Sequence, residues 1–263
     1  MEAKCPSSGI NNPVSIKVLH TEAELNEWHR QQNNKIHFVP TMGALHLGHA
    51  EIIKVAKKLS IKNSGSVLVS IFVNPLQFNE NEDFARYPKN LDHDCNIAWN
   101  AGANAIWAPS YEDVFPGGED NHFKVEVPKR LTAHLCGANR KGHFDGVASV
   151  VIQLLKLVKP SFLFLGEKDW QQLVILRQLV EDFALPIEIK SIGTVRENDG
   201  LACSSRNQYL NNEERKNALN LSKELAKASH QVSSLEPINL KKIKSSLEKK
   251  GLKVEYIETV DIK

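Results

Sequence analysis

Cysteine is scarce in this 263-residue chain, and its four copies lie far apart: Cys5, Cys95, Cys136 and Cys203. With no Cys-x-x-Cys pair, a disulfide framework and a structural zinc site are disfavoured, and the composition fits a protein of the reducing cytoplasm. Long hydrophobic runs are also missing, because the most apolar helical stretch, SVVIQLLKLV at 149–158, is too short and too polar to span a bilayer. The first residues, MEAKCPSSGINNP, lack the apolar core of a signal peptide, so we predict a loose tail over residues 1–15.

A strong charge of either sign is absent. Lys and Arg number 33 against 31 Asp and Glu, which leaves a net charge of +2. This balance carries no signature of nucleic-acid or membrane binding, and we expect neither as a partner. Hydrophobic residues at 41% and charged residues at 24% are ordinary for a soluble globular protein that buries a sizeable core.

Two common nucleotide-binding motifs are missing as well. No Gly-x-Gly-x-x-Gly occurs, and GANRKGHF at 137–144 has the glycine spacing of a P-loop but places His143 where that motif needs Lys. A zinc hydrolase helix is disfavoured because the chain has no His-Glu-x-x-His.

Short apolar runs alternate with segments of helical period. We predict strands at 35–39, 66–73, 104–108, 162–165 and 187–195, a half-exposed strand at 122–127, and helices from about residue 49, at 145–159 and at 170–183. Strands alternating with helices predict an α/β fold, a Rossmann-like parallel sheet with helices on both faces.

The composition changes after residue 210 to Lys, Glu, Asn and Ser with helical spacing, and LKVEYIETVDI closes the chain as an alternating strand. We therefore predict a larger domain over 16–194 and a smaller α+β C-terminal domain, lid-like, over 195–263.

The stretch PTMGALHLGH at 40–49 lies where the first predicted strand gives way to a helix. Ligands collect at the carboxyl ends of parallel strands. Gly43, Ala44 and Gly48 let a large group approach the backbone, and the free N–H groups of the helix start attract phosphate. His46 and His49 share one face of the first turn. Taken alone, such a histidine pair is more often structural than catalytic.

PTMGALHLGH resembles the His-x-Gly-His signature of the nucleotidylyltransferase superfamily, which is related to class I aminoacyl-tRNA synthetases. Four further blocks narrow the resemblance: NPLQF (74–78), HFDGV (143–147), GEKDWQQL (166–173) and DGLACSSRN (199–207). In that order and at those intervals, from about residue 16 to the end, they are similar to the pantothenate synthetase family, also called pantoate–β-alanine ligases.

The resemblance implies a two-step condensation. The carboxylate of pantoate attacks the α-phosphorus of Mg²⁺-bound ATP to give pantoyl adenylate and pyrophosphate, and the amine of β-alanine then displaces AMP to give pantothenate. The family also implies a homodimer. An anion must approach a polyanion, so the site must supply positive charge and exclude water.

The resemblance further implies roles for individual residues. His49, the family's proposed proton donor, His46, Lys168 and Arg206 would be catalytic and meet the phosphates. The whole ATP-binding set would be Met42, Gly43, Ala44, Leu45, His46, Leu47, Gly48, His49, Gly166, Glu167, Lys168, Asp169, Val195, Cys203, Ser204, Ser205 and Arg206. Pantoate would contact Gln77, Gln172, Arg140 and His143, and Gln77 would also help to place β-alanine. Asp94 would lie on the magnesium side, or it is an acid on a surface helix.

Three residues depart from the family pattern. Leu47 replaces a common acidic residue, Cys203 replaces a common Met, and His93 occupies an often acidic position beside Asp94. The chain also stops at VDIK, earlier than most relatives, so it is either a compact version or the front part of a longer polypeptide, since some bacterial relatives fuse a nucleotide kinase behind this module.

Two rival functions remain open. Another nucleotidylyltransferase, acting on a phosphorylated substrate, would share the histidine turn but need extra cations in its acceptor pocket. A nucleotide sensor or an RNA-associated domain would need neither catalytic histidine, and the near-neutral charge disfavours RNA.

Overall fold

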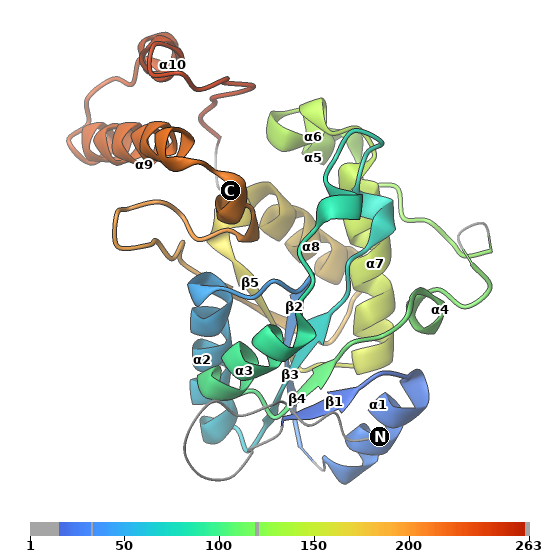
Figure 1. Ribbon diagram of the computed structural model, residues 1–263. Coiled ribbons are helices and arrows are strands. Elements are labelled where there is room, and N and C mark those ends of the chain that lie inside the picture. Colours follow the sequence, from blue (N-terminus) through green and yellow to red (C-terminus); the bar gives the residue numbers. More distant parts are fainter. Residues whose placement is uncertain (1–15, 33, 119–120, 261–263) are drawn as a thin grey trace.

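The computed structural model describes residues 16–32, 34–118 and 121–260, so the predicted tail at 1–15 lies outside the described residues (Figure 1). A six-stranded sheet in the order β1-β4-β3-β2-β5-β6 forms its centre, and every pair is parallel. The strands are β1 (Lys17–Leu19), β2 (Ile36–Thr41), β3 (Ser66–Ile71), β4 (Ala105–Trp107), β5 (Phe162–Gly166) and β6 (Glu188–Ile192). The predicted parallel sheet is confirmed.

Helices cover both faces of this sheet (Figure 1). On one face, α1 (Glu22–Gln31), α7 (His143–Val158) and α8 (Trp170–Asp182) share an apolar cluster with the strands. On the other face, α2 (Leu47–Lys62) and α3 (Leu91–Ala101) share a second cluster. Cover on both faces explains why β3 reads as an unbroken apolar run, since five of its six residues are buried.

Shorter helical segments connect these elements near the carboxyl ends of the strands. They are α4 (Tyr111–Val114), α5 (Lys129–Thr132), α6 (Leu135–Asn139) and the 3₁₀ turns η1 (Pro75–Gln77), η2 (Phe84–Arg86), η3 (Glu167–Asp169) and η4 (Ser205–Tyr209). After η4 come α9 (Asn212–Ser233) and α10 (Leu240–Glu248), which lie beyond the carboxyl edge of the sheet (Figure 1).

The sequence prediction omitted β1 and α1. The helix α1 carries a capping box, in which Thr21 accepts from the backbone of Glu24 and Glu24 caps in return. Its buried residues are Leu25 and Trp28, a narrow apolar stripe. The strand β1 is three residues long, below the length at which alternation is readable.

The strand predicted at 122–127 is wrong. This segment pairs with no strand in the described residues, and Phe123, which a strand would place on one face with Val125 and Val127, is 96% exposed. Its backbone donors bond instead to side chains of α7, from Val125 N to Ser149 Oγ at 2.8 Å and from Val127 N to Asp145 Oδ1 at 2.8 Å. Two helix side chains thus replace a β-ladder.

The closing strand is also wrong as far as residue 260, where the described chain ends. The described part of the C-terminal segment contains η4, α9, α10 and one isolated antiparallel bridge between Arg196 and Ala202, so it is not α+β. The two helices are tied by the buried carboxylate of Glu224, which accepts from Ser246 Oγ at 3.2 Å and from Lys250 Nζ at 3.0 Å. Within the described residues, no helix combines the length and apolarity needed to cross a membrane.

Candidate active site

A cleft lies at the carboxyl edge of the sheet, where β2, η1, α7, β5 and the segments 193–195 and 203–206 converge. It brings together His46, Lys168 and Arg206, which are far apart in sequence. Of the predicted site residues, those that line the cleft are Met42, His46, Gly48, His49, Gln77, Arg140, His143, Gly166, Lys168, Asp169, Gln172, Val195, Cys203, Ser204, Ser205 and Arg206.

The remaining predicted residues support the cleft from outside its lining. Leu45 is buried in the apolar cluster under α2, whereas Leu47 is 65% exposed. Glu167 accepts a hydrogen bond from Ser191 Oγ at 2.9 Å. Gly43 and Ala44 form the turn between β2 and the start of α2.

Asp94 holds this turn from beneath. Its side chain is 1% exposed, and its two oxygens accept from the backbone N–H groups of Ala44 at 3.0 Å and Leu45 at 2.6 Å. Burial raises the pKa of Asp94, against the effect of the two hydrogen bonds. Asp94 therefore does not fit the predicted magnesium ligand, because its carboxylate is occupied and lies outside the cleft lining. The alternative prediction, that Asp94 is an acid on the surface of a helix, is wrong as well, because the residue is buried.

The two histidines cap the start of α2. The backbone N–H of Gly48 donates to Nδ1 of His46 at 3.1 Å, and the backbone N–H of His46 donates to Nδ1 of His49 at 3.3 Å. Because each Nδ1 accepts, each neutral ring carries its proton on Nε2. Glycine is required at position 48, since an added Cβ would lie 2.9 Å from Cε1 of His46.

Burial keeps both rings neutral in the ligand-free protein. Loss of hydration, followed by the charge of Lys168, lowers the pKa of His46 to about 4. Loss of hydration, followed by the proximity of His46, lowers the pKa of His49 to about 3. His49, which the resemblance makes the proton donor, is a neutral ring in this environment. His46 and His49 can therefore each donate one hydrogen bond to a phosphate from a neutral Nε2–H group.

Lys168 provides positive charge next to this pair. It follows β5 in η3, and its Nζ lies 3.3 Å from Oδ1 of Asp169 in an exposed ion pair. Exposed pairs of this kind are weak, so Lys168 can change partners at little cost. Its charge contributes to lowering the pKa values of both His46 and His49.

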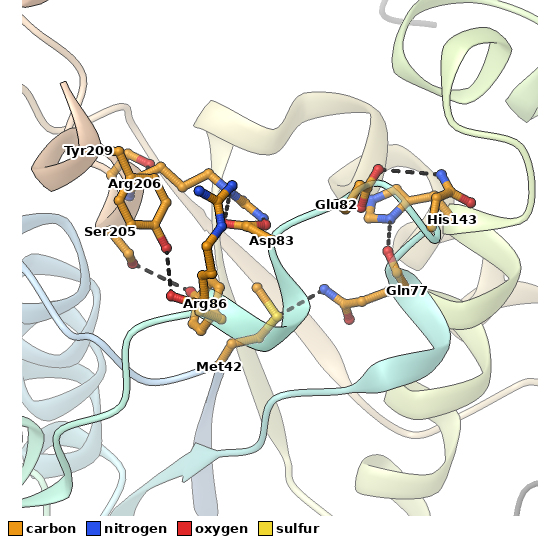
Figure 2. Close-up of polar contacts among 12 residues, drawn as sticks. Met42, Gln77, Glu82, Asp83, Arg86, His143, Ser205, Arg206 and Tyr209 are labelled. Atoms are coloured by element: carbon orange, nitrogen blue, oxygen red, sulfur yellow. Dashed lines mark hydrogen bonds and ion pairs between the residues drawn. The ribbon is translucent and has the colours of Figure 1, made fainter.

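Gln77 lies beside Met42, and the buried side chain of Asn74 holds its amide in place. The amide of Asn74 donates to Gln77 Oε1 at 3.2 Å and to the carbonyl of Gly146 at 3.1 Å. Gln77 Nε2 approaches Met42 Sδ at 3.0 Å (Figure 2). Gln172, in α8, lines the cleft, and its side-chain amide makes no hydrogen bond to another described residue. The Gln172 amide is therefore free for a polar ligand, whereas the Gln77 amide must share its oxygen with Asn74 and exchange its weak contact with Met42 Sδ for a ligand.

Arg140 and His143 belong to a chain of hydrogen bonds that runs from Glu82 to the backbone carbonyl of Gln77. Glu82 accepts from Arg140 Nε at 2.7 Å, Arg140 donates to His143 Nε2 at 2.9 Å, and His143 Nδ1–H donates to the carbonyl of Gln77 at 2.7 Å. Burial lowers the pKa of His143, in keeping with a neutral ring whose Nε2 accepts. The arginine predicted to hold pantoate is thus paired with a carboxylate in the ligand-free protein.

Arg206 is paired in the same way. Its guanidinium makes two bonds to Asp83, from Nε at 2.9 Å and from a terminal nitrogen at 2.6 Å. Beside it, Ser205 Oγ donates to the carbonyl of Ala44 at 3.1 Å, so the C-terminal segment touches the histidine turn directly. Burial raises the pKa of Cys203, which lines the cleft as a neutral thiol.

Sequence reasoning missed four residues that shape this cleft: Asn74, Glu82, Asp83 and Tyr87. Asn74 lies in the NPLQF block but was given no role, although it caps η1 by accepting from Leu76 N at 3.3 Å. Glu82 and Asp83 lie in a polar stretch that reads as solvated loop. Among the described residues, no group of three or more His, Cys, Asp or Glu side chains could hold a metal ion.

A parallel α/β sheet with cationic and N–H donors gathered at a helix start defines a protein that binds an anionic ligand at the carboxyl edge. The chain belongs to the pantoate-beta-alanine ligase family, whose model matches residues 17–263.

Known proteins resemble this chain closely. It is 56% identical over 252 residues to a bifunctional pantoate ligase/cytidylate kinase of Prochlorococcus marinus, covering 95% of this chain and 49% of that protein. It is 50% identical over 232 residues to the bifunctional protein of a Synechococcus strain, covering 86% of this chain and 46% of that one. The chain therefore spans about half the length of these curated relatives.

Solved structures share the fold. Pantothenate synthetase from Thermus thermophilus is 39% identical with a TM-score of 0.79, covering 89% of this chain and 82% of that one. Pantoate-beta-alanine ligase from Francisella tularensis, solved with beta-gamma ATP and beta-alanine, is 34% identical with a TM-score of 0.82, covering 94% and 90%.

Proposed function

We propose that this chain condenses pantoate with β-alanine, using ATP, to give pantothenate, AMP and pyrophosphate through pantoyl adenylate. The observation that carries this proposal is one cleft that joins phosphate-binding groups at His46, His49 and Lys168 to neutral amides at Gln77 and Gln172. The pantoate ligase activity for which the relatives are named and the ligands of the Francisella structure support it.

In the first step, one carboxylate oxygen of pantoate bonds to the α-phosphorus of ATP, and the bond to the bridging oxygen of pyrophosphate breaks. The two Nε2–H groups and Lys168 stabilise the charge that grows on the phosphates, and Arg206 binds the departing pyrophosphate. Each such preorganised donor is worth on the order of 10²–10³ in rate. The neutral histidines act as hydrogen-bond donors through Nε2–H, while each Nδ1 accepts from a backbone N–H at the start of α2.

In the second step, the β-alanine amine attacks the acyl carbon and AMP leaves. Gln77 and Gln172 hold pantoate by donating to its oxygens and accepting from its hydroxyls without adding charge. Gly166, Asp169 and Val195 hold the adenosine, with Asp169 on the ribose hydroxyls.

Magnesium enters as part of the substrate, Mg²⁺-bound ATP. Mg²⁺ keeps several waters and binds phosphate oxygens readily, so it needs few protein ligands. That behaviour agrees with a cleft whose described residues lack a carboxylate cluster. No protein ligand for the ion is assigned.

We further propose that residues 195–263 act as a lid over the nucleotide, because Ser205 and Arg206 reach the cleft from this segment. The chain's resemblance to the family also supports a homodimer in the cytoplasm.

Mass spectrometry of the product from pantoate, β-alanine and ATP, with and without magnesium, tests the proposed activity. Pantothenate and AMP in equal amounts are expected. Pyrophosphate release only with a phosphorylated acceptor, and none with pantoate, would establish the rival nucleotidylyltransferase activity instead.

A further inference from the structure

Glu82 and Asp83 are neighbours in sequence, yet they pair with arginines that come from different parts of the fold. Glu82 pairs with Arg140, just before α7, and Asp83 pairs with Arg206, in η4 of the C-terminal segment. Figure 2 shows the two carboxylates side by side on one loop, with Arg206 beside Asp83 and His143 beyond Glu82. One short loop thus holds two guanidiniums that line the cleft.

A substrate anion could bind either arginine in the same two-bond geometry as the carboxylate of the loop. Asp83 receives two parallel bonds from Arg206 at 2.6 and 2.9 Å, and Glu82 receives bonds from two nitrogens of Arg140. Bidentate pairing of this kind is also how guanidinium binds the carboxylate of a ligand or a phosphate. A ligand anion and the loop carboxylate cannot both occupy the same edge of the guanidinium.

The side chains are shielded enough for the pairs to matter. The carboxylates are the shielded partners, since Asp83 is 11% and Glu82 22% exposed, whereas Arg206 is 46% and Arg140 28% exposed; the Arg206 guanidinium also lies 5.7 Å from the ring centroid of Tyr87. A partly shielded carboxylate left beside a bound anion would repel it. Binding of an anion at either arginine therefore favours departure of the loop.

The loop is built so that the two carboxylates move together. Glu82 N bonds to the carbonyl of Asn79 at 2.9 Å, and Arg86 N bonds to the carbonyl of Asp83 at 3.0 Å. Two tight turns thus flank the acidic pair on either side, and no residue separates Glu82 from Asp83. A movement of the loop backbone that withdraws one carboxylate therefore also withdraws its neighbour.

We propose that Glu82 and Asp83 are built-in competitors for the substrate anions, and that their joint displacement couples the binding of ATP to the binding of pantoate. This inference rests on the proposed function, in which Arg206 binds pyrophosphate, and on the contact with pantoate that the family resemblance implies for Arg140. The first ligand must open both ion pairs, whereas the second finds its arginine already free. The result is positive coupling between two ligands that would otherwise repel each other.

Calorimetric titration tests this coupling. The nucleotide is α,β-methylene-ATP, which cannot release pyrophosphate, and it is titrated with and without saturating pantoate into the wild type, Glu82→Gln and Asp83→Asn. Glu80→Gln is the matched control, because Glu80 is an exposed acid of the same loop with no bond to either arginine. Thermal melting of each variant verifies folding, and each of the two test variants probes the proposal separately.

In the wild type and in Glu80→Gln, saturating pantoate is expected to lower the Kd of the nucleotide by about fivefold or more. In Asp83→Asn the nucleotide alone should bind tighter, in Glu82→Gln pantoate alone should bind tighter, and the coupling in both should fall below about twofold. Binding of both ligands with equal coupling in all four proteins, or without coupling in the wild type, would overturn the inference alone. A wild type that binds neither ligand would overturn the proposed function and this inference with it.

Discussion

The backbone of His46 fixes the position of the proton on the ring of His49 at the start of α2. The backbone N–H of His46 donates to Nδ1 of His49 at 3.3 Å, and the two rings lie 4.0 Å apart between centroids. Since Nδ1 of His46 accepts from Gly48, both rings keep their proton on Nε2. A helix N-terminus with its own positive end thus gains two side-chain N–H donors.

Replacing His49 by Asn or by Gln tests the roles of its two ring nitrogens separately. His49→Asn keeps an acceptor near the position of Nδ1 and loses the Nε2–H donor, whereas His49→Gln restores a donor near Nε2. We expect His49→Asn to fold normally and to lose on the order of 10²–10³ in the rate of adenylate formation, with partial recovery in His49→Gln. Pantoate-dependent exchange of labelled pyrophosphate into ATP measures this rate. Wild-type exchange in His49→Asn would remove His49 from the mechanism.

Stability at acidic pH depends on the same pair. The folded pKa values of His46 and His49, about 4 and about 3, lie below the ordinary value of 6.5, so between these limits the unfolded chain binds more protons than the folded one. Stability therefore falls as the pH drops below 6.5. Each buried ring should contribute on the order of 1 kcal/mol to the loss between about pH 7 and pH 5.

Urea unfolding of the wild type and of the His46→Asn, His49→Asn double variant at both pH values checks this prediction. The double variant should lose less free energy of unfolding than the wild type on going to the lower pH. An equal loss in both proteins would show that the two rings are not held neutral.

We expect Asp94 to support ATP binding by holding the turn at Ala44 and Leu45, and not by binding magnesium. Asp94→Asn turns one carboxylate oxygen into an N–H₂ group that faces a backbone donor, which costs about 1–3 kcal/mol of stability and loosens the turn at Ala44 and Leu45. We expect weaker binding of α,β-methylene-ATP both with magnesium and with EDTA. A defect confined to samples with magnesium would restore Asp94 as a metal ligand.

Gly146 sets the position of Gln77. A Cβ at residue 146 would lie 2.0 Å from the carbonyl oxygen of Leu76, so α7 and η1 touch backbone to backbone. Gly146→Ala should cost about 1–3 kcal/mol, the usual range for overpacking, and weaken pantoate binding by displacing η1. Urea unfolding and calorimetry measure the two effects. Gly193→Ala, which has no neighbour within 4 Å of the added carbon, is the stability control.

Features that depend on neighbouring residues were predictable from sequence. The buried strands read as apolar runs, and the segments at 40–49, 166–173 and 199–207 each follow a structural break that places them near one sheet edge. Their meeting in one cleft follows from parallel topology, because all strands end on the same side.

Features that depend on distant partners were not predictable. Asp94 bonds to a turn 50 residues earlier, and Arg206 bonds to Asp83 across 123 residues. An acid in a polar stretch looks the same in sequence whether it is solvated or paired. The apolar alternation at 122–127 exists in the sequence, but Phe123 is 96% exposed in the structure. The backbone of this segment bonds to Ser149 and Asp145 on α7, which no strand pattern reveals.

Transfer of oxygen from pantoate to AMP probes the proposed chemistry at the bond that defines it. Pantoate labelled with ¹⁸O in its carboxylate is incubated with ATP, magnesium and β-alanine, and the nucleotide product is weighed by mass spectrometry. If the carboxylate attacks the α-phosphorus in the cleft of His46, His49 and Lys168, each AMP formed carries one ¹⁸O atom. Unlabelled AMP, or ADP with the label in inorganic phosphate, would contradict the formation of pantoyl adenylate.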